Sequence, residues 1–317
     1  MHRFRILSLD GGGIKGTFTA AVLAELERMT GKRLAHYFDL ITGTSTGGLI
    51  AIALGLGIPA EEVLDFYQRE GPNIFPSMGI QRRVNNLRWF CGPKYSTTNL
   101  RNAIGCVVGN RRLGESKCRL AIPSFNAVNG DIYIFKTAHH ERFKQDFKQP
   151  AIEVALATSA APTYFPALQA ESGLSYIDGG IWANCPVTIG IVEALAVLGR
   201  TTQDLEVLSI GTTDEPFYVE HKRRNGGLFA WNKNLIFLQA QAQVAGSLAQ
   251  AKVLLRDRFV RANATTHPNR FKMDDASQIS ELKGLGVTEA RHRENEISQR
   301  FLDTQAEPFV PSYRVTL

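Results

Sequence analysis

The 317-residue chain lacks several features that would place it in a specialised class of proteins. No apolar run approaches the ~20 residues that a transmembrane helix needs, and the N-terminus shows no signal-peptide pattern. Only four cysteines occur, with no CxxC pair and no histidine at metal-ligand spacing: Cys91, Cys106, Cys118 and Cys185. The sequence therefore predicts a cytoplasmic protein with buried, unpaired thiols, without a disulfide framework and without a metal or other cofactor.

What the chain does contain is ordinary for a globular protein, with 44% hydrophobic residues and a formal net charge of +6. A chain of this length suits one large α/β domain, and no internal repeat or low-complexity segment divides it. A moderately positive charge fits an anionic partner such as a phospholipid surface. The basic residues are mostly dispersed and form no nucleic-acid motif, so no nucleic-acid polymer is expected as a partner.

Apolar runs that end at glycine or proline predict strands alternating with helices. We expect strands at 5–9, 38–42, 119–125, 131–136, 176–177 and 205–210. We expect helices from Thr17, over 49–56 and 60–68, from Pro150, over 187–198, and in the last third over 234–256 and 287–302. The alternation predicts an α/β fold in which helices cover both faces of a mostly parallel sheet. Glycine and proline interrupt the segment 71–97, which we predict to be a functional loop.

A glycine-rich run, Asp10-Gly-Gly-Gly-Ile-Lys-Gly16, follows the first predicted strand. Gly11, Gly13 and Gly16 match the dinucleotide-binding pattern G-x-G-x-x-G. Consecutive glycine N–H groups at a helix N-terminus also form a binding site for an oxyanion. The dinucleotide pattern expects an acidic residue ~20 residues further on, at the end of the second strand, and none stands there. By itself this run leaves nucleotide binding, oxyanion binding and a structural turn open.

A second glycine-flanked motif, Gly43-Thr-Ser45-Thr-Gly47, fits the pattern G-x-S-x-G between a strand and a helix. This is the context of a nucleophile elbow, in which glycines allow a sharp turn that exposes the serine hydroxyl. The alternative is a loop rich in glycine and threonine that only caps the next helix. The apolar runs on both sides favour a catalytic role for Ser45.

A serine nucleophile needs a base. None of the seven histidines lies in a recognisable motif, and the pair His139-His140 sits in a polar stretch that predicts exposure at the surface. Asp178, in Tyr176-Ile-Asp-Gly-Gly180, is the other candidate. Seen alone, its Asp-Gly pair indicates a hairpin turn.

The order of these motifs along the chain resembles the patatin-like phospholipases, whose patterns are D-G-G-G-x-[RK]-G, G-x-S-x-G and D-G-[GA]. They correspond here to Asp10–Gly16, Gly43–Gly47 and Asp178–Gly180. The stretches Ser159–Pro166 and Asn184–Val187 are also similar to those that flank the family's catalytic aspartate. The resemblance implies a three-layer α/β fold.

The resemblance covers about residues 4–212 of what we expect to be a single domain, 1–317. A C-terminal part at about 213–317, expected to be helical, matches nothing in the family pattern. The alternatives that remain are a dinucleotide-binding oxidoreductase, which would use the first glycine loop, and a non-catalytic binding protein with the patatin fold.

For the mechanism, the resemblance implies a phospholipase A-type acyl hydrolase with a Ser-Asp dyad. Ser45 would attack the ester carbonyl, and Asp178 would accept its proton. The family pattern assigns the remaining roles to the first loop, with the oxyanion on the backbone N–H groups of Gly11, Gly12 and Gly13, and phosphate binding or loop support on Lys15. A carboxylate with a pKa of ~4 is a poor base at neutral pH, so burial must raise the pKa of Asp178.

Two segments, 75–94 and 222–237, mix aromatic with basic residues, which suits the interface between lipid and anionic headgroups. They predict peripheral docking on the inner face of the membrane, unless their aromatics are core and their charges a solvated rim. Some bacterial members of the family act in anti-phage defence and are switched on by a cyclic nucleotide. The basic clusters Arg82-Arg83 and Lys222–Arg224 are our candidates for binding such a cyclic dinucleotide activator.

Overall fold

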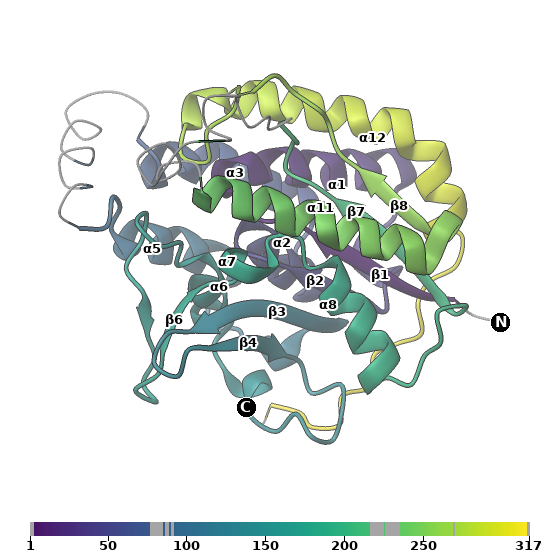
Figure 1. The fold of residues 1–317 in the computed structure, drawn as a ribbon. Coiled ribbons are helices and arrows are strands. Elements are labelled where there is room, and N and C mark those ends of the chain that lie inside the picture. Colours follow the sequence, from purple (N-terminus) through teal and green to yellow (C-terminus); the bar gives the residue numbers. More distant parts are fainter. Residues whose placement is uncertain are drawn as a thin grey trace.

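The computed structural model of the protein describes residues 3–76, 85, 89, 92–215, 225, 235–268 and 270–315. Its centre is an eight-stranded sheet between helical layers (Figure 1). The strands are β1 Phe4–Leu9, β2 Leu40–Gly43, β3 Arg119–Asn126, β4 Asp131–Lys136, β5 Leu168–Gln169, β6 Ser175–Asp178, β7 Leu205–Ile210 and β8 Phe259–Ala262. The helices are α1 Gly16–Thr30, α2 Thr46–Gly55, α3 Ala60–Ile74, α5 Thr97–Val108, α6 Ala151–Ser159, α7 Gly180–Ala183, α8 Val187–Val192, α11 Leu235–Leu255 and α12 Ile279–Phe301.

Five neighbouring strands of the sheet, in the order β3-β2-β1-β7-β8, run parallel to one another. Strands β4 and β6 pair antiparallel with β3, and the short β5 extends β6 at that edge. The predicted α/β class with a mostly parallel sheet is confirmed. Asp178 is the last residue of β6, one of these antiparallel strands.

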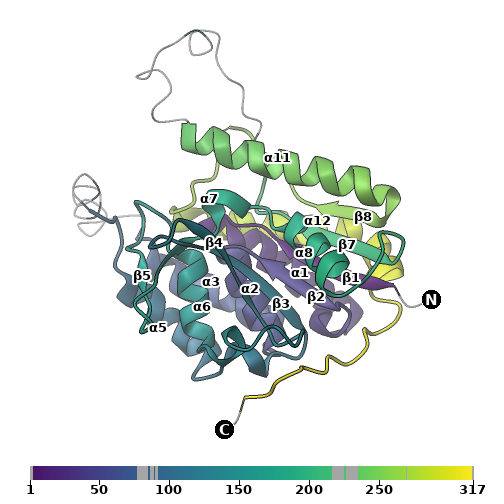
Figure 2. The same ribbon diagram turned by 60° about the horizontal axis from the view of Figure 1, so that its bottom comes forward.

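The two faces of the sheet bury separate apolar cores, as the alternation of side chains along β1 shows. Leu7 and Leu9 pack into the larger core, under α1, α2, α3, α6 and α12. Phe4 and Ile6 point the other way, into the smaller core beneath α8 and α11. Figure 2 shows α11 lying across this second face, with α1, α2 and α3 on the far side of the sheet. Because strands buried on both faces are apolar along most of their length, β1 was recognisable from its sequence despite Arg5 and Ser8.

The predicted loop 71–97 begins later than expected, because α3 continues through Gly71 and Pro72 to Ile74. Gly71 lies tightly packed, since a Cβ there would come within 2.8 Å of side-chain carbons of both Ile14 and Ile279. Tertiary packing of this kind overrides the weak helix propensity of glycine and proline. The expectation of irregular structure over residues 71–74 was therefore wrong.

The last third of the chain contains a strand where only helices were expected. The missed strand β8 lies between α11 and α12 and pairs with β7, with Val260 opposite Leu208. It has only four residues, and so short an apolar run gives no usable periodicity. The helix α12 also begins at Ile279, eight residues before the expected start at 287, and packs along α1.

His139 is buried, so the prediction of a surface histidine pair was wrong for this residue. Its Nε2 lies 2.9 Å from Glu193 Oε1, and its Nδ1 lies 2.9 Å from Thr137 Oγ1. One polar neighbour in the sequence, Thr137, is thus a partner inside the protein, and the other partner, Glu193, comes from a distant segment. Burial lowers the pKa of His139, and the hydrogen bond to Glu193 opposes this effect. The ring is committed to this internal network.

The expectation of buried thiols holds for Cys118 and Cys185 and fails for Cys106. Cys106 is exposed because α5 buries its opposite face, which carries Leu100, Ala103, Ile104 and Val108. Cys91 lies outside the described residues.

Candidate active site

The carboxyl ends of β2 and β6 meet on one edge of β3, while β4 occupies the other edge. In this register Thr42 of β2 lies opposite Ala121 of β3, and Asp178 of β6 lies opposite Ser124, three residues further along β3. Ser45 is also three residues beyond Thr42. The two strands therefore bring Ser45 and Asp178 together from positions far apart in the sequence.

Ser45 sits at a sharp turn between β2 and α2, with φ 55° and ψ −122°. Positive φ is strained for a residue with a side chain and is most often found at functional sites. A Cβ on Gly43 would lie 2.1 Å from the Gly47 carbonyl oxygen, and one on Gly47 would lie 2.3 Å from the Leu9 carbonyl oxygen. Both glycines are thus required by close backbone contacts. The Ser45 N–H donates to Thr158 Oγ1 at 3.0 Å, which fixes the turn.

Asp178 is a buried carboxyl at the end of β6. Burial raises its pKa to about 6, although hydrogen bonds from the Gly180 N–H and the Ser45 hydroxyl favour the charged form. The Gly180 N–H donates to Asp178 Oδ1 at 2.6 Å. A carboxyl with this pKa is a better base near neutral pH than an exposed aspartate.

The first glycine loop lies beside this pair and has only part of its backbone free. The Gly11 N–H donates to the Asn184 carbonyl oxygen at 2.9 Å, and the Gly11 carbonyl accepts a hydrogen bond from Thr212 Oγ1 at 2.9 Å. Within the described part of the chain, the N–H groups of Gly12 and Gly13 have no acceptor. Of the three glycines predicted to bind an oxyanion, Gly12 and Gly13 therefore retain available donors, whereas the Gly11 N–H is engaged.

Two residues at the site received no individual role from the sequence. Thr158 holds the Ser45 backbone, as described above. Asn184 lies between the motifs, because a Cβ on Gly11 would come within 2.5 Å of Asn184 Oδ1 and one on Gly180 within 3.3 Å. The same Cβ on Gly11 would lie 3.3 Å from Ser45 Cβ. The only sequence signal was the likeness of the stretch around Asn184 to the family pattern.

Lys15 extends from the glycine loop towards the segment after β7. Its Nζ donates to the Thr213 carbonyl oxygen at 3.4 Å. Burial lowers the pKa of Lys15, and the carboxylates of Glu215 and Asp214 oppose this effect. Of the two expected roles, this contact favours support of the loop.

The segment 75–94 departs in part from its predicted role at a lipid surface. Phe75 is buried, with its ring centroid 5.3 Å from that of Tyr95 and 6.0 Å from that of Phe165. Trp89 is 43% exposed, and Lys94 Nζ lies 4.5 Å from the centre of its ring. The other residues that suggested a lipid surface in this segment and in 222–237 mostly lie outside the described part of the chain, and they include both basic clusters, Arg82-Arg83 and Lys222–Arg224, together with Met78, Arg88, Phe90, Phe229 and Trp231.

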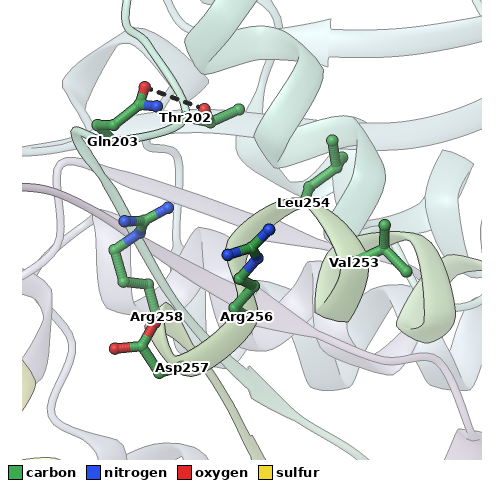
Figure 3. Close-up of a pocket in the computed structure, with 7 residues that line it drawn as sticks. All are labelled: Thr202, Gln203, Val253, Leu254, Arg256, Asp257 and Arg258. Atoms are coloured by element: carbon green, nitrogen blue, oxygen red, sulfur yellow. Dashed lines mark hydrogen bonds between the residues drawn. The ribbon is translucent and has the colours of Figure 1, made fainter.

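A groove of about 450 Å³ lies far from these residues, at the amino ends of β7 and β8 (Figure 3). Ser45, in contrast, follows the carboxyl end of β2. The side chains of Arg256 and Arg258 both line the groove and make it basic on one side. The lining residues are Thr202, Gln203, Val253, Leu254, Arg256, Asp257 and Arg258. This groove contains no nucleophile–base pair, so it is not the site of ester chemistry.

Among the residues that the structure describes, no three His, Cys, Asp or Glu side chains are grouped so that they could hold a metal ion. In the same residues, no helix combines the length and apolarity needed to span a bilayer.

A family model described as patatin-like phospholipase matches residues 7–191, which is more than half of the chain. The chain therefore belongs to the patatin-like phospholipase family, a family of lipid hydrolases. The resemblance inferred from the three glycine-flanked motifs is confirmed, and the first glycine loop, Asp10–Gly16, lies within the residues that the family model matches.

Among curated proteins, three bacterial proteins called cGAMP-activated phospholipase match most of the chain. The protein from Pseudomonas aeruginosa is 31% identical over 309 residues, which cover 96% of this chain and 91% of the relative. Those from Vibrio cholerae and Escherichia coli are 34% and 32% identical, covering 81% and 97% of this chain and 78% and 95% of the relatives. Two of these matches thus extend through the C-terminal third, beyond the family model.

Proposed function

We propose that this protein hydrolyses carboxylic ester bonds of membrane phospholipids, with Ser45 as nucleophile and Asp178 as its base. The observation that carries the proposal is the approach of a serine at a positive-φ elbow to a buried carboxyl whose pKa is raised to about 6. A carboxylate that serves only as a turn residue is normally solvated and needs neither burial nor a serine partner.

The chemistry proceeds in two acyl-transfer steps. Ser45 Oγ attacks the ester carbonyl carbon while Asp178 accepts the hydroxyl proton, and the N–H groups of Gly12 and Gly13 bind the resulting oxyanion. The intermediate collapses to an acyl-enzyme, and Asp178 returns the proton to the departing lysophospholipid alcohol. Asp178 then activates a water molecule, which releases the fatty acid and restores Ser45.

The oxyanion donors supply much of the rate, because an aspartate is still a weaker base than histidine. Removing one such donor typically lowers kcat by ~10²–10³. Asp178 nevertheless has an advantage in this site: a pKa of about 6 leaves it largely ionised at neutral pH while making proton acceptance easier than for an exposed aspartate.

The decisive experiment compares Ser45→Ala with Ser175→Ala. The Ser175 hydroxyl accepts a hydrogen bond from Gln169 Nε2 on the neighbouring strand and serves as the matched control. Ser45→Ala should abolish both hydrolysis of short p-nitrophenyl esters and labelling by a fluorophosphonate, and Ser175→Ala should change neither. If Ser45→Ala keeps more than a tenth of the activity, the nucleophile is assigned wrongly.

We further propose that a cyclic dinucleotide activates this enzyme as an effector of antiviral defence. The proposal is supported by the names of the relatives, two of which match at least 96% of this chain. Phospholipid hydrolysis with and without cGAMP tests it, and an absence of response refutes it. Charge reversal at Arg82-Arg83, at Lys222–Arg224 and at Arg256 with Arg258 then shows which basic group is needed.

We also propose that the active protein docks peripherally on the inner membrane surface. The proposal is supported by Trp89, an exposed aromatic side chain of the kind that favours the headgroup region. Lys94, which lies over the Trp89 ring, is buried and paired with Asp274, so the basic groups would have to come from elsewhere in the two segments. Co-sedimentation of the protein with anionic vesicles at low and high salt tests this proposal.

A further inference from the structure

Asp10, the first residue of the glycine loop, forms a buried ion pair with Arg261 of the edge strand β8. Arg261 on β8 places Nη2 2.6 Å from Asp10 Oδ2 and donates from Nη1 to Ser209 Oγ at 2.8 Å. Asp10 is 3% exposed. Because the guanidinium is a planar fork with fixed donor directions, two simultaneous contacts fix its position and, through it, that of the carboxylate.

Arg261 favours the ionised form of the Asp10 carboxylate but does not fully offset burial, since the pKa of Asp10 stays above its usual value. Burial raises the pKa of Asp10, while the charge and hydrogen bond of Arg261 and a hydrogen bond from Cys185 lower it. Burial also acts to lower the pKa of Arg261, but the charge of Asp10 and the hydrogen bond to it act in the opposite direction, and the pKa of Arg261 is raised above its usual range. Loss of either partner would leave a buried charge uncompensated.

The loop is fastened at its other end by the same part of the chain. The Ile14 N–H donates to the Met273 carbonyl oxygen at 2.9 Å, and a Cβ on Gly13 would lie only 2.3 Å from that oxygen. The two N–H groups without acceptors, on Gly12 and Gly13, lie between these two attachments. Residues beyond the family match, which ends at residue 191, thus attach both ends of the loop.

We propose that Arg261 is a positioning residue which, through Asp10, holds the Gly12 and Gly13 N–H groups where the oxyanion forms. This inference rests on the proposed function, because it assumes that those two groups stabilise the transition state. A buried pair that only stabilises the fold would change the folded fraction and leave the turnover of the folded enzyme intact. Positioning, in contrast, acts on kcat, since displacements of ~1 Å at a reacting group can cost ~10²-fold in rate.

The experiment uses Arg261→Met, Arg261→Lys, Asp10→Asn and the double variant Asp10→Asn with Arg261→Met. For folded protein counted by active-site titration, Arg261→Met should lower kcat by about 10- to 100-fold while KM changes less than about two-fold. Arg261→Lys, which keeps the charge but loses the fork, should fall in between. The double variant should be no slower than the single variants, since both remove the same attachment.

The ion pair between Lys136 and Glu193 provides a matched control. Lys136 Nζ lies 2.6 Å from Glu193 Oε2, and both residues lie away from the glycine loop. Glu193→Gln should lower the melting temperature and leave kcat unchanged. Hydrogen exchange of residues 10–16 gives a second measure, and it should increase in Arg261→Met but not in Glu193→Gln. If Arg261→Met does not fold, the double variant Asp10→Asn with Arg261→Met is used instead, because it leaves no buried carboxylate without a partner.

Two outcomes separate this inference from the proposed dyad. If Ser45→Ala is inactive and the Arg261 variants keep kcat within two-fold of wild type, the positioning role is refuted and the dyad stands. If Ser45→Ala remains active, the dyad fails, while faster exchange of residues 10–16 in Arg261→Met still supports the attachment of the loop. Unchanged exchange in that variant overturns the inference.

Discussion

Replacing Asp178 by asparagine should inactivate the enzyme and stabilise its fold. Asparagine keeps the size of the side chain and an oxygen for the Gly180 N–H, which donates at 2.6 Å. It cannot accept a proton and carries no charge that burial penalises. The pKa of Asp178 is raised from 3.8 to about 6 in the folded protein, a shift of roughly two units. At about 1.4 kcal/mol per unit, the folded state loses up to about 3 kcal/mol at pH 7 relative to a neutral side chain.

The sign of this effect fixes its dependence on pH. Below pH 3.8 the carboxyl is protonated in both the folded and unfolded states, so the penalty is absent. It grows as the pH rises through the window up to about 6 and is then constant. The gain in stability from Asp178→Asn should therefore be about 3 kcal/mol at pH 7 and roughly half of that at pH 5.

Urea denaturation of wild type and Asp178→Asn at the two pH values measures this difference, and ester turnover measures the loss of activity. The wild-type kcat/KM should rise with pH through about 6, as Asp178 ionises. A variant that is less stable than wild type at pH 7, or a difference that does not depend on pH, would refute the argument that burial raises the pKa. A variant that retains turnover would refute the assignment of Asp178 as base.

Three further predictions concern the loop, a histidine and the membrane. Gly12→Ala and Gly13→Ala should each lower kcat more than they raise KM. Both should lower the melting temperature, because the new Cβ would lie 2.4 Å from Thr212 Oγ1 at Gly12 and 2.3 Å from the Met273 carbonyl oxygen at Gly13. Gly13→Ala should lower it more, since Gly13 also has φ +59° and meets backbone; a larger loss of stability in Gly12→Ala would contradict this. His139→Ala should destabilise the protein through loss of the contact with Glu193 yet leave turnover of the folded fraction intact, and a folded, inactive variant would indicate a histidine base. Arg82→Glu with Arg83→Glu should weaken co-sedimentation with anionic vesicles by ~1 kcal/mol per charge, less so at high salt. Turnover of a soluble ester should not change in that variant. A parallel loss of vesicle binding and of soluble-ester turnover would disprove membrane docking through these arginines.

Local chemistry explains why the glycine loop and the serine elbow could be located from the sequence. Gly43 and Gly47 are required because a Cβ at either position would come within 2.1–2.3 Å of a backbone carbonyl oxygen, and this restricts the residue type wherever the turn occurs. The strand β1 was equally accessible, because burial on both faces leaves a short, mostly apolar run that ends at a glycine-rich turn. Ser45 and the loop after β1 were therefore predicted from residues that are neighbours in the chain.

The sequence by itself thus determined the family, the class of fold and the turns that carry the serine and the glycines. Only the tertiary structure decided how they meet, because Asp178 is placed by antiparallel pairing with β3, the strand that also pairs with β2. The burial of His139 and Phe75, and the attachment of Asp10 to Arg261, likewise depend on contacts between distant segments. Such contacts leave no periodicity in either segment, since each partner looks like an ordinary polar or aromatic residue until the chain brings the two together.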